Sequence, residues 1–125
     1  MIVGTGIDIV EVPRIGQSIE RFGERFLKRI FTPAEIRYCQ AKANYVERFA
    51  ARFAAKEAGM KAIGTGMRGG VSWQDFEVGR EPGGRPTMLL HGKAAQVAAG
   101  LGTRRAHLSV SHTEEHAVAY VILED

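Results

Sequence analysis

The segment from Arg52 to Gly66 constrains this chain most, because it places charges inside a helical apolar pattern. At 100° per residue, one face of a helix over this region collects apolar side chains, namely Val46, Phe49, Phe53, Met60 and Ile63. Lys56 falls inside that face and Glu57 lies at its edge. Burying a charge is costly unless it is paired or bound to an ion. We therefore expect both charges to have partners, either in the chain or in a ligand.

The end of the same segment is rich in glycine. Gly64, Thr65 and Gly66 follow the apolar pattern directly. Glycine permits left-handed backbone conformations and the close approach of another backbone or of a phosphate. Lys61 lies four residues after Glu57, so a carboxylate and an ammonium can meet along one flank of the helix.

Length and composition indicate one globular domain that spans residues 1–125. Hydrophobic residues make up 45% of the chain and charged residues 25%, which is typical of soluble proteins. No apolar run is long enough to span a bilayer, and the first residues lack a signal-peptide pattern. Cys39 is the single cysteine, which agrees with a reducing compartment. We therefore expect a cytoplasmic protein without a membrane partner.

The net charge of +3 favours an anionic partner but does not identify it. A nucleic-acid-binding module is the alternative from another class. The aromatic residues do not alternate with the basic ones as a base-stacking surface requires. We therefore expect no nucleic-acid partner.

Periodicity and turn residues predict an α+β domain in which an antiparallel sheet packs on a long central helix. The capping-box sequence from Thr32 to Glu35 marks one helix start, and Gly23 is a candidate break in the helix before it. The predicted helices cover 13–30, 32–43, 45–63 and 93–99. The predicted strands or extended segments cover 2–10, 71–79, 87–91, 107–111 and 117–123.

Asp8 and Glu57 are the strongest candidates for chemistry. Alternation along the first strand places Gly4, Gly6 and Asp8 on one face, which leaves an open lane for a ligand or a crossing backbone, although the glycines could also mark a bulge. Two carboxylates can hold Mg²⁺, which completes its shell with water and phosphate oxygens. A purely structural alternative stays open, in which Asp8 caps the following helix or pairs with an arginine and Glu57 pairs with Lys61.

Two further groups of residues are candidates for binding. Ser111 and His112 are neighbours in a strand, so their side chains point to opposite faces and cannot form a catalytic pair with each other. They can still bind a nucleotide or phosphate, or they are ordinary polar residues of a strand end. A basic stripe lies along residues 13–30, either as a solvated surface or as the complement of an acidic partner. It consists of Arg14, Arg21, Arg25 and Lys28.

Four motifs in order resemble the holo-acyl-carrier-protein synthases, the small bacterial type of the 4'-phosphopantetheinyl transferase superfamily. They are GIDIVEVPRI at 6–15, RFAAKEAGMKAIGTG at 52–66, GRP at 84–86 and HLSVSHTEEHAVAYVI at 107–122. The resemblance covers essentially the whole chain. It implies a 4'-phosphopantetheinyl transferase-like fold.

The resemblance also implies a reaction. The 4'-phosphopantetheine arm of coenzyme A moves to a serine of apo acyl carrier protein, adenosine 3',5'-bisphosphate leaves, and the product serves fatty acid biosynthesis. By position in the motifs, Asp8 and Glu57 match the Mg²⁺ ligands, and Lys61 matches a lysine near the diphosphate. Other matching residues line the coenzyme A site, namely Lys56, Gly64, Thr65, Gly66, Ser111 and His112.

The resemblance extends to partners. Arg14, Arg21, Arg25 and Phe22 fall on the helical region that matches the docking surface for the acidic carrier protein. The family forms homotrimers with active sites at subunit interfaces, which we carry over as an expectation. One departure is Gly59, where many relatives have a bulkier residue; glycine weakens a helix by about 1 kcal/mol relative to alanine. A non-catalytic binding protein of the same fold is a further alternative.

Overall fold

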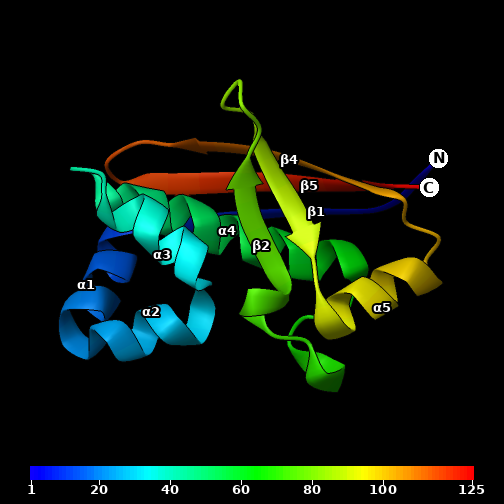
Figure 1. The fold of residues 1–125 in the computed structure, drawn as a ribbon, viewed down its shortest axis with the longest axis horizontal. Coiled ribbons are helices and arrows are strands. Elements are labelled where there is room, and N and C mark those ends of the chain that lie inside the picture. Colours follow the sequence, from blue (N-terminus) through cyan, green and yellow to red (C-terminus); the bar gives the residue numbers. More distant parts are fainter.

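The computed structural model of the protein describes all residues from 1 to 125 (Figure 1). Five helices and five strands follow one another, with short 3₁₀ turns at Arg68–Gly70 and Trp73–Asp75. The helices are α1 (Val12–Phe22), α2 (Glu24–Ile30), α3 (Pro33–Gln40), α4 (Tyr45–Ile63) and α5 (Gly92–Gly100). The strands are β1 (Ile2–Glu11), β2 (Phe76–Arg80), β3 (Pro86–Leu90), β4 (Arg105–His112) and β5 (His116–Glu124).

The predicted α+β architecture is confirmed, with α4 packed along an antiparallel sheet. The strands divide into two sheets, however, rather than one. β1, β5 and β4 form a three-stranded sheet in that order, and β2 pairs only with β3. The two chain ends lie side by side (Figure 1). The amino group of Met1 pairs with the carboxylate of Asp125. In the three-stranded sheet β1 is an edge strand, and it packs against α4.

The glycines of β1 allow α4 to cross the strand at very close range. A Cβ atom on Gly6 would lie 1.9 Å from the carbonyl oxygen of Ala58, and one on Gly4 would lie 2.3 Å from that of Ala62. The open lane in front of Asp8 is therefore filled by a crossing backbone. A bulge is also present, between Ile2 and Gly4. The close contact between the glycines of β1 and α4 fixes the position of Asp8 relative to α4.

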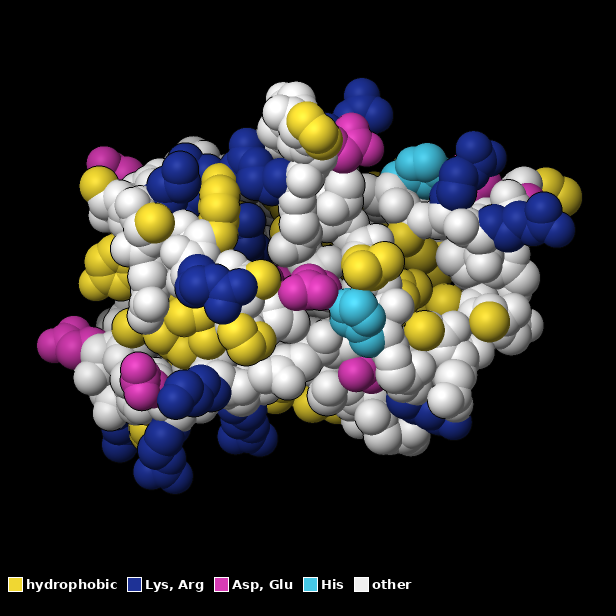
Figure 2. Space-filling model, viewed as in Figure 1, with side chains coloured by type: hydrophobic (Ala, Val, Ile, Leu, Met, Phe, Trp, Pro, Cys, Tyr) yellow, Lys and Arg dark blue, Asp and Glu magenta, His cyan; other side chains and the backbone are white.

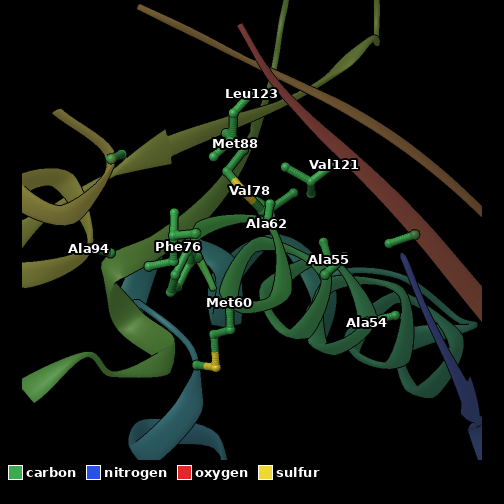
Figure 3. Packing of buried hydrophobic residues seen from close by; sticks show 14 of the residues in the cluster. Ala54, Ala55, Met60, Ala62, Phe76, Val78, Met88, Ala94, Val121 and Leu123 are labelled. Atoms are coloured by element: carbon green, nitrogen blue, oxygen red, sulfur yellow. The ribbon is translucent and has the colours of Figure 1, made fainter. Parts of the chain in front are cut away.

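α4 is buried on more sides than its apolar stripe predicted. Phe49, Met60 and Ile63 are buried as expected. The alanines between them are buried too, because small side chains let strands and neighbouring helices approach from several directions (Figure 3). They are Ala50, Ala51, Ala54, Ala55, Ala58 and Ala62. α4 is thus a central core helix, and a charge on it meets protein on most sides.

Gly59 is explained by packing. A Cβ atom there would lie 2.6 Å from a ring carbon of Phe76 and 3.2 Å from the sulfur of Met88. The aromatic ring thus occupies the space of the missing side chain, so the loss of helix propensity is offset by burial of Phe76.

Several predicted boundaries need correction. The break at Gly23 is confirmed, and Thr32 and Glu35 form the predicted capping box, but α3 ends at Gln40 rather than near residue 43. The predicted start of α4 at residue 45 is confirmed, and the side-chain oxygen of Asn44, just before it, accepts a hydrogen bond from Arg48 at 3.2 Å. The extended segment 71–79 is in part a 3₁₀ turn, and β2 begins only at Phe76. None of the helices has both the length and the apolar character needed to cross a bilayer.

Candidate active site

A groove of about 510 Å³ lies where β1, α1 and α4 meet. Asp8 from β1 and Glu57 from α4 both line it. Arg14 and Arg21 of α1 line the same groove, together with several apolar side chains. The structure therefore brings the two predicted metal ligands together and places cations of the basic stripe beside them.

Asp8 pairs with a lysine rather than capping a helix. The Nζ atom of Lys61 lies 3.1 Å from Oδ1 of Asp8 and donates a second hydrogen bond to the carbonyl of Ile7 at 2.9 Å. α1 begins after Glu11 without a side-chain cap. The structural alternative is therefore wrong in its details, because Lys61 serves Asp8 and not Glu57. Lys61 is 58% exposed, so a ligand in solution can reach it.

Glu57 is half-buried and has no ion-pair partner in the chain. Burial is the main cause that raises the pKa of this carboxyl, and the negative charge of Asp8 raises it further. The indole of Trp73 and the ammonium of Lys61 act in the opposite direction, with smaller effects. A carboxylate that is both desolvated and repelled by its neighbour would gain from a bound cation.

The two carboxylates fit a divalent cation that binds together with a phosphate. No group of three or more His, Cys, Asp or Glu side chains is arranged so that it could hold a metal ion by itself. Mg²⁺ takes one or two protein carboxylates and fills the rest of its octahedron with water and substrate phosphate oxygens. Asp8 and Glu57 meet that requirement, and their mutual repulsion is the physical reason that a cation would be held there.

Lys56 lies away from the groove, in the core. Its side chain has no exposed surface, and its Nζ atom lies 2.8 Å from Oε1 of Glu35. The same ammonium donates to the carbonyl oxygens of Phe76 at 2.7 Å and Trp73 at 3.2 Å. Burial lowers the pKa of Lys56, and the Glu35 carboxylate opposes that shift. Lys56, expected at the coenzyme A site, thus has all its donors used inside the protein and no surface for a ligand.

Ser111 and His112 lie elsewhere in the chain, beyond β5 from Asp8. Two strand spacings separate β1 from β4, roughly 10 Å. Nδ1 of His112 lies 2.9 Å from a carboxylate oxygen of Glu47, and the ring lines a second cavity of about 230 Å³. In a single copy of the chain these residues therefore do not meet the carboxylate pair.

The second cavity holds three arginines that the sequence reasoning missed, namely Arg48, Arg52 and Arg80. The guanidinium of Arg52 stacks 4.3 Å from the ring centroid of Tyr38, and Arg48 and Arg80 both donate to the phenol oxygen. Such a concentration of positive charge suits a phosphate. Arg48 and Arg52 are four residues apart on one helix, and this spacing could have indicated the basic cavity from the sequence.

The glycine-rich turn lies at the C-terminal end of α4. Gly64 adopts the predicted left-handed conformation with φ of 80°, and the hydroxyl of Thr65 donates to the carbonyl of Gly66. At 1.5 Å per residue, this turn begins about 10 Å along the helix axis from Glu57. It therefore lies beyond Lys61, and a long ligand that extends from the groove would have to pass Lys61 to reach it.

The expected docking residues adjoin the groove. Arg14, Arg21 and Phe22 line it directly, and Arg25 lines a neighbouring cavity that also includes Phe22. Gly23 divides the stripe between α1 and α2, so it is not one continuous helix face. Figure 2 shows Lys and Arg side chains along the lower edge of the molecule, over α1 and α2.

Comparison with known proteins agrees with this arrangement. Residues 4–121 match the family model of the 4'-phosphopantetheinyl transferase superfamily. The holo-[acyl-carrier-protein] synthase of Koribacter versatilis is 86% identical over 125 residues, which cover both chains completely. The chain belongs to the 4'-phosphopantetheinyl transferase superfamily.

Solved structures give the same result. The crystal structure of holo-[acyl-carrier-protein] synthase from Neisseria meningitidis has a TM-score of 0.89 and 39% identity, with complete coverage of both chains. The enzyme of Helicobacter pylori in complex with coenzyme A has a TM-score of 0.84 and 31% identity, and the match covers 96% of this chain and 99% of that one. Both the fold and the length of this chain therefore match those of the solved holo-[acyl-carrier-protein] synthases.

Proposed function

We propose that this chain transfers the 4'-phosphopantetheine arm of coenzyme A to a serine of apo acyl carrier protein and releases adenosine 3',5'-bisphosphate. The observation that carries the proposal is the groove that Asp8 and Glu57 both line, beside the cations of α1. The names of the relatives and the coenzyme A complex of a structural neighbour support the same reaction.

The reaction displaces one phosphate of a diphosphate, so it needs charge neutralisation and in-line positioning. Asp8 and Glu57 would hold Mg²⁺, which supplies Lewis-acid stabilisation to the diphosphate oxygens when bound. Lys61, mostly exposed and tethered to Asp8, is within reach of a diphosphate beside that carboxylate. The attacking hydroxyl belongs to the carrier protein, so the chain needs no nucleophile of its own.

The carrier would dock on α1 and the start of α2. Arg14, Arg21 and Arg25 offer positive charge to an acidic helix, and Phe22 is 51% exposed beside them. Complementary charge of this kind accelerates encounter and fixes orientation. Because these residues adjoin the groove, a serine on the docked carrier would face the carboxylate pair.

We further propose a homotrimer with active sites at the subunit interfaces. The outer face of the three-stranded sheet exposes a row of apolar side chains, including Ile7 at 55%, Ile9 at 66% and Tyr120 at 41%. An apolar sheet face of this kind favours burial against another subunit. Such an assembly would bring the cavity lined by His112 on one subunit next to the groove of another, as a continuous coenzyme A site.

The proposal includes a cytoplasmic location and a role in fatty acid biosynthesis. The single thiol, Cys39, is buried and free, and burial raises its pKa to about 11. A free, unreactive thiol agrees with a reducing compartment.

Intact-mass spectrometry of a bacterial apo acyl carrier protein tests the reaction. After incubation with this chain, coenzyme A and Mg²⁺, the carrier should gain the mass of one phosphopantetheine, and EDTA should abolish the gain. A folded protein that leaves the carrier unmodified under these conditions would contradict the proposal. Sedimentation equilibrium tests the trimer separately.

A further inference from the structure

Tyr38, near the end of α3, is surrounded by cations from several parts of the chain. The guanidinium of Arg52 lies 4.3 Å from the centroid of its ring, and that of Arg80 lies 5.3 Å away. The ammonium of Lys42 lies 5.1 Å from the same centroid. The phenol oxygen accepts hydrogen bonds from Arg80 and, at 3.5 Å, from Arg48. Tyr38 is thus a common contact of cations that repel one another.

Three of these cations line the second cavity and lack an anionic partner. They are Arg48, Arg52 and Arg80, and none of them forms a salt bridge with a carboxylate of the chain. Arg52 is only 7% exposed, and its Nε atom is buried without a hydrogen-bond partner. Burying a guanidinium without a counter-charge is costly. The cavity therefore suits a ligand that brings negative charge and hydrogen-bond acceptors, as a phosphate does.

A neutral tyrosine can hold these arginines without competing for their charge. The face of its ring attracts a cation, and its hydroxyl oxygen accepts hydrogen bonds from more than one donor. An aspartate or glutamate in its place would also hold the arginines, but its negative charge would compete with an anionic ligand. Tyr38 does not line the cavity itself. It therefore restricts the guanidinium groups and leaves their positive charge available to a ligand.

The position of Tyr38 is set by contacts of α3 with the elements that supply the arginines. Glu35, one turn earlier on α3, accepts a hydrogen bond from the backbone N–H of Val78 at 2.7 Å and pairs with Lys56 at 2.8 Å. Val78 belongs to β2, as Arg80 does, and it lines the same cavity. Lys56 belongs to α4. These contacts tie α3 to both α4 and β2, so the ring of Tyr38 is in place before a ligand binds.

We infer that Tyr38 is a positioning residue for coenzyme A, and that it holds the arginines of the second cavity in place for the 3'-phosphate. The inference rests on the proposed function, in which this cavity joins the groove of a neighbouring subunit as one coenzyme A site. The groove takes the diphosphate, so the phosphate left for the cavity is the 3'-phosphate of the departing adenosine 3',5'-bisphosphate. Guanidinium groups that are already restricted lose less side-chain freedom on binding, which raises affinity.

Isothermal titration calorimetry with coenzyme A and with dephospho-coenzyme A, which lacks the 3'-phosphate, tests this inference without turnover. Tyr38→Leu removes both the ring and the hydroxyl, so we expect the dissociation constant of coenzyme A to rise by about 5- to 10-fold. Tyr38→Phe keeps the ring and should give a smaller rise. Both variants should bind dephospho-coenzyme A like the wild type, because that ligand does not use the arginines. A merely structural role would weaken both ligands alike.

Tyr45→Leu is the matched control, because Tyr45 is exposed at the start of α4 and lines neither the groove nor the second cavity. It should bind both ligands like the wild type. Coenzyme A affinity of Tyr38→Leu within about two-fold of the wild type, or an equal loss for both ligands, would overturn the inference and leave the proposed function intact.

The wild type provides the remaining comparison, and we expect it to bind coenzyme A more tightly than dephospho-coenzyme A. Equal affinity for the two ligands would exclude the phosphate site and overturn the inference, whereas a mass gain of the carrier protein would still support the transfer reaction. Failure of the wild type to bind coenzyme A at all would overturn the proposed function and, with it, this inference.

Discussion

Lys56 and Glu57 are neighbours on α4, yet the protein treats their charges in opposite ways. Lys56 is sealed in the core, where Glu35 and two backbone carbonyls use every donor of its ammonium. Glu57 lines an open groove opposite a second carboxylate and has no counter-charge of its own. The buried contacts of Lys56 hold α3, α4 and β2 together. In the groove, the repulsion between Glu57 and Asp8 remains, and a bound cation would relieve it. In this protein the paired charge of Lys56 stabilises the fold, and the unpaired charge of Glu57 lies in the candidate site.

The largest effect on stability should come from breaking the sealed pair. Lys56→Met leaves the Glu35 carboxylate buried without its counter-ion, so we expect the free energy of unfolding in urea to fall by about 3–5 kcal/mol. The exposed Lys93 provides a matched control, and Lys93→Met should change stability by less than about 0.5 kcal/mol. A loss below about 1 kcal/mol for Lys56→Met would show that the buried pair does not hold the core together.

The open pair, formed by Asp8 and Glu57, should affect the transfer rate strongly and stability only slightly. Asp8→Asn keeps the shape of the side chain but removes one anionic ligand, so we expect the transfer rate to fall by about 10²–10³-fold. Because Asp8 pairs only with a largely exposed lysine, stability should change by less than about 1 kcal/mol. Asp125→Asn removes the same charge at the chain end and should leave the rate unchanged. A near-normal rate for Asp8→Asn would refute the assignment of Asp8 as a ligand.

A smaller effect should come from the cations beside the open pair. The double variant Arg14→Glu and Arg21→Glu should raise the KM for the carrier protein by about 10-fold, because close like charges at an interface oppose docking. The KM for coenzyme A should stay close to that of the wild type. Arg104→Glu is the matched control, because Arg104 lies just before β4 and lines neither the groove nor the cavity beside it. Equal increases in both constants would indicate general damage rather than a docking surface.

The sequence predicted the helix that carries Lys56 and Glu57 better than it predicted the site around Glu57. The pattern of residues 45–63 predicted α4 with its correct bounds, and it required a partner for Lys56. It could not identify Glu35 as that partner, because the capping box already gave Glu35 a local role, and long-range pairing depends on how α3 packs on α4. The burial of α4 on several sides was missed because alanines carry little weight in an apolar pattern.

From the sequence, only the central residues of the candidate site were correctly predicted to lie together. Motif positions brought Asp8, Glu57 and Lys61 together, as the structure does. Ser111 and His112 were expected in the same site, but a single copy of the chain separates them from the carboxylates by two strand spacings. Strand order is a tertiary property that local pattern does not encode, and contacts between subunits are further removed still.

The most direct test of the account compares the thermal unfolding of the wild type and Glu57→Gln. A carboxylate whose pKa is raised in the folded state costs stability above that pKa, and the cost disappears as the pH falls through it. At about pH 8, Glu57→Gln should therefore be more stable by about 0.5–1 kcal/mol, and this advantage should shrink on acidification. Its transfer activity should be lost.

Excess Mg²⁺ with coenzyme A completes this measurement, because a ligand that binds only the folded state raises its unfolding temperature. We expect Mg²⁺ to stabilise the wild type but not Glu57→Gln, and so to remove the advantage of the variant. A wild-type protein that is already as stable as Glu57→Gln without metal, and that gains nothing from Mg²⁺ and coenzyme A, would contradict the account.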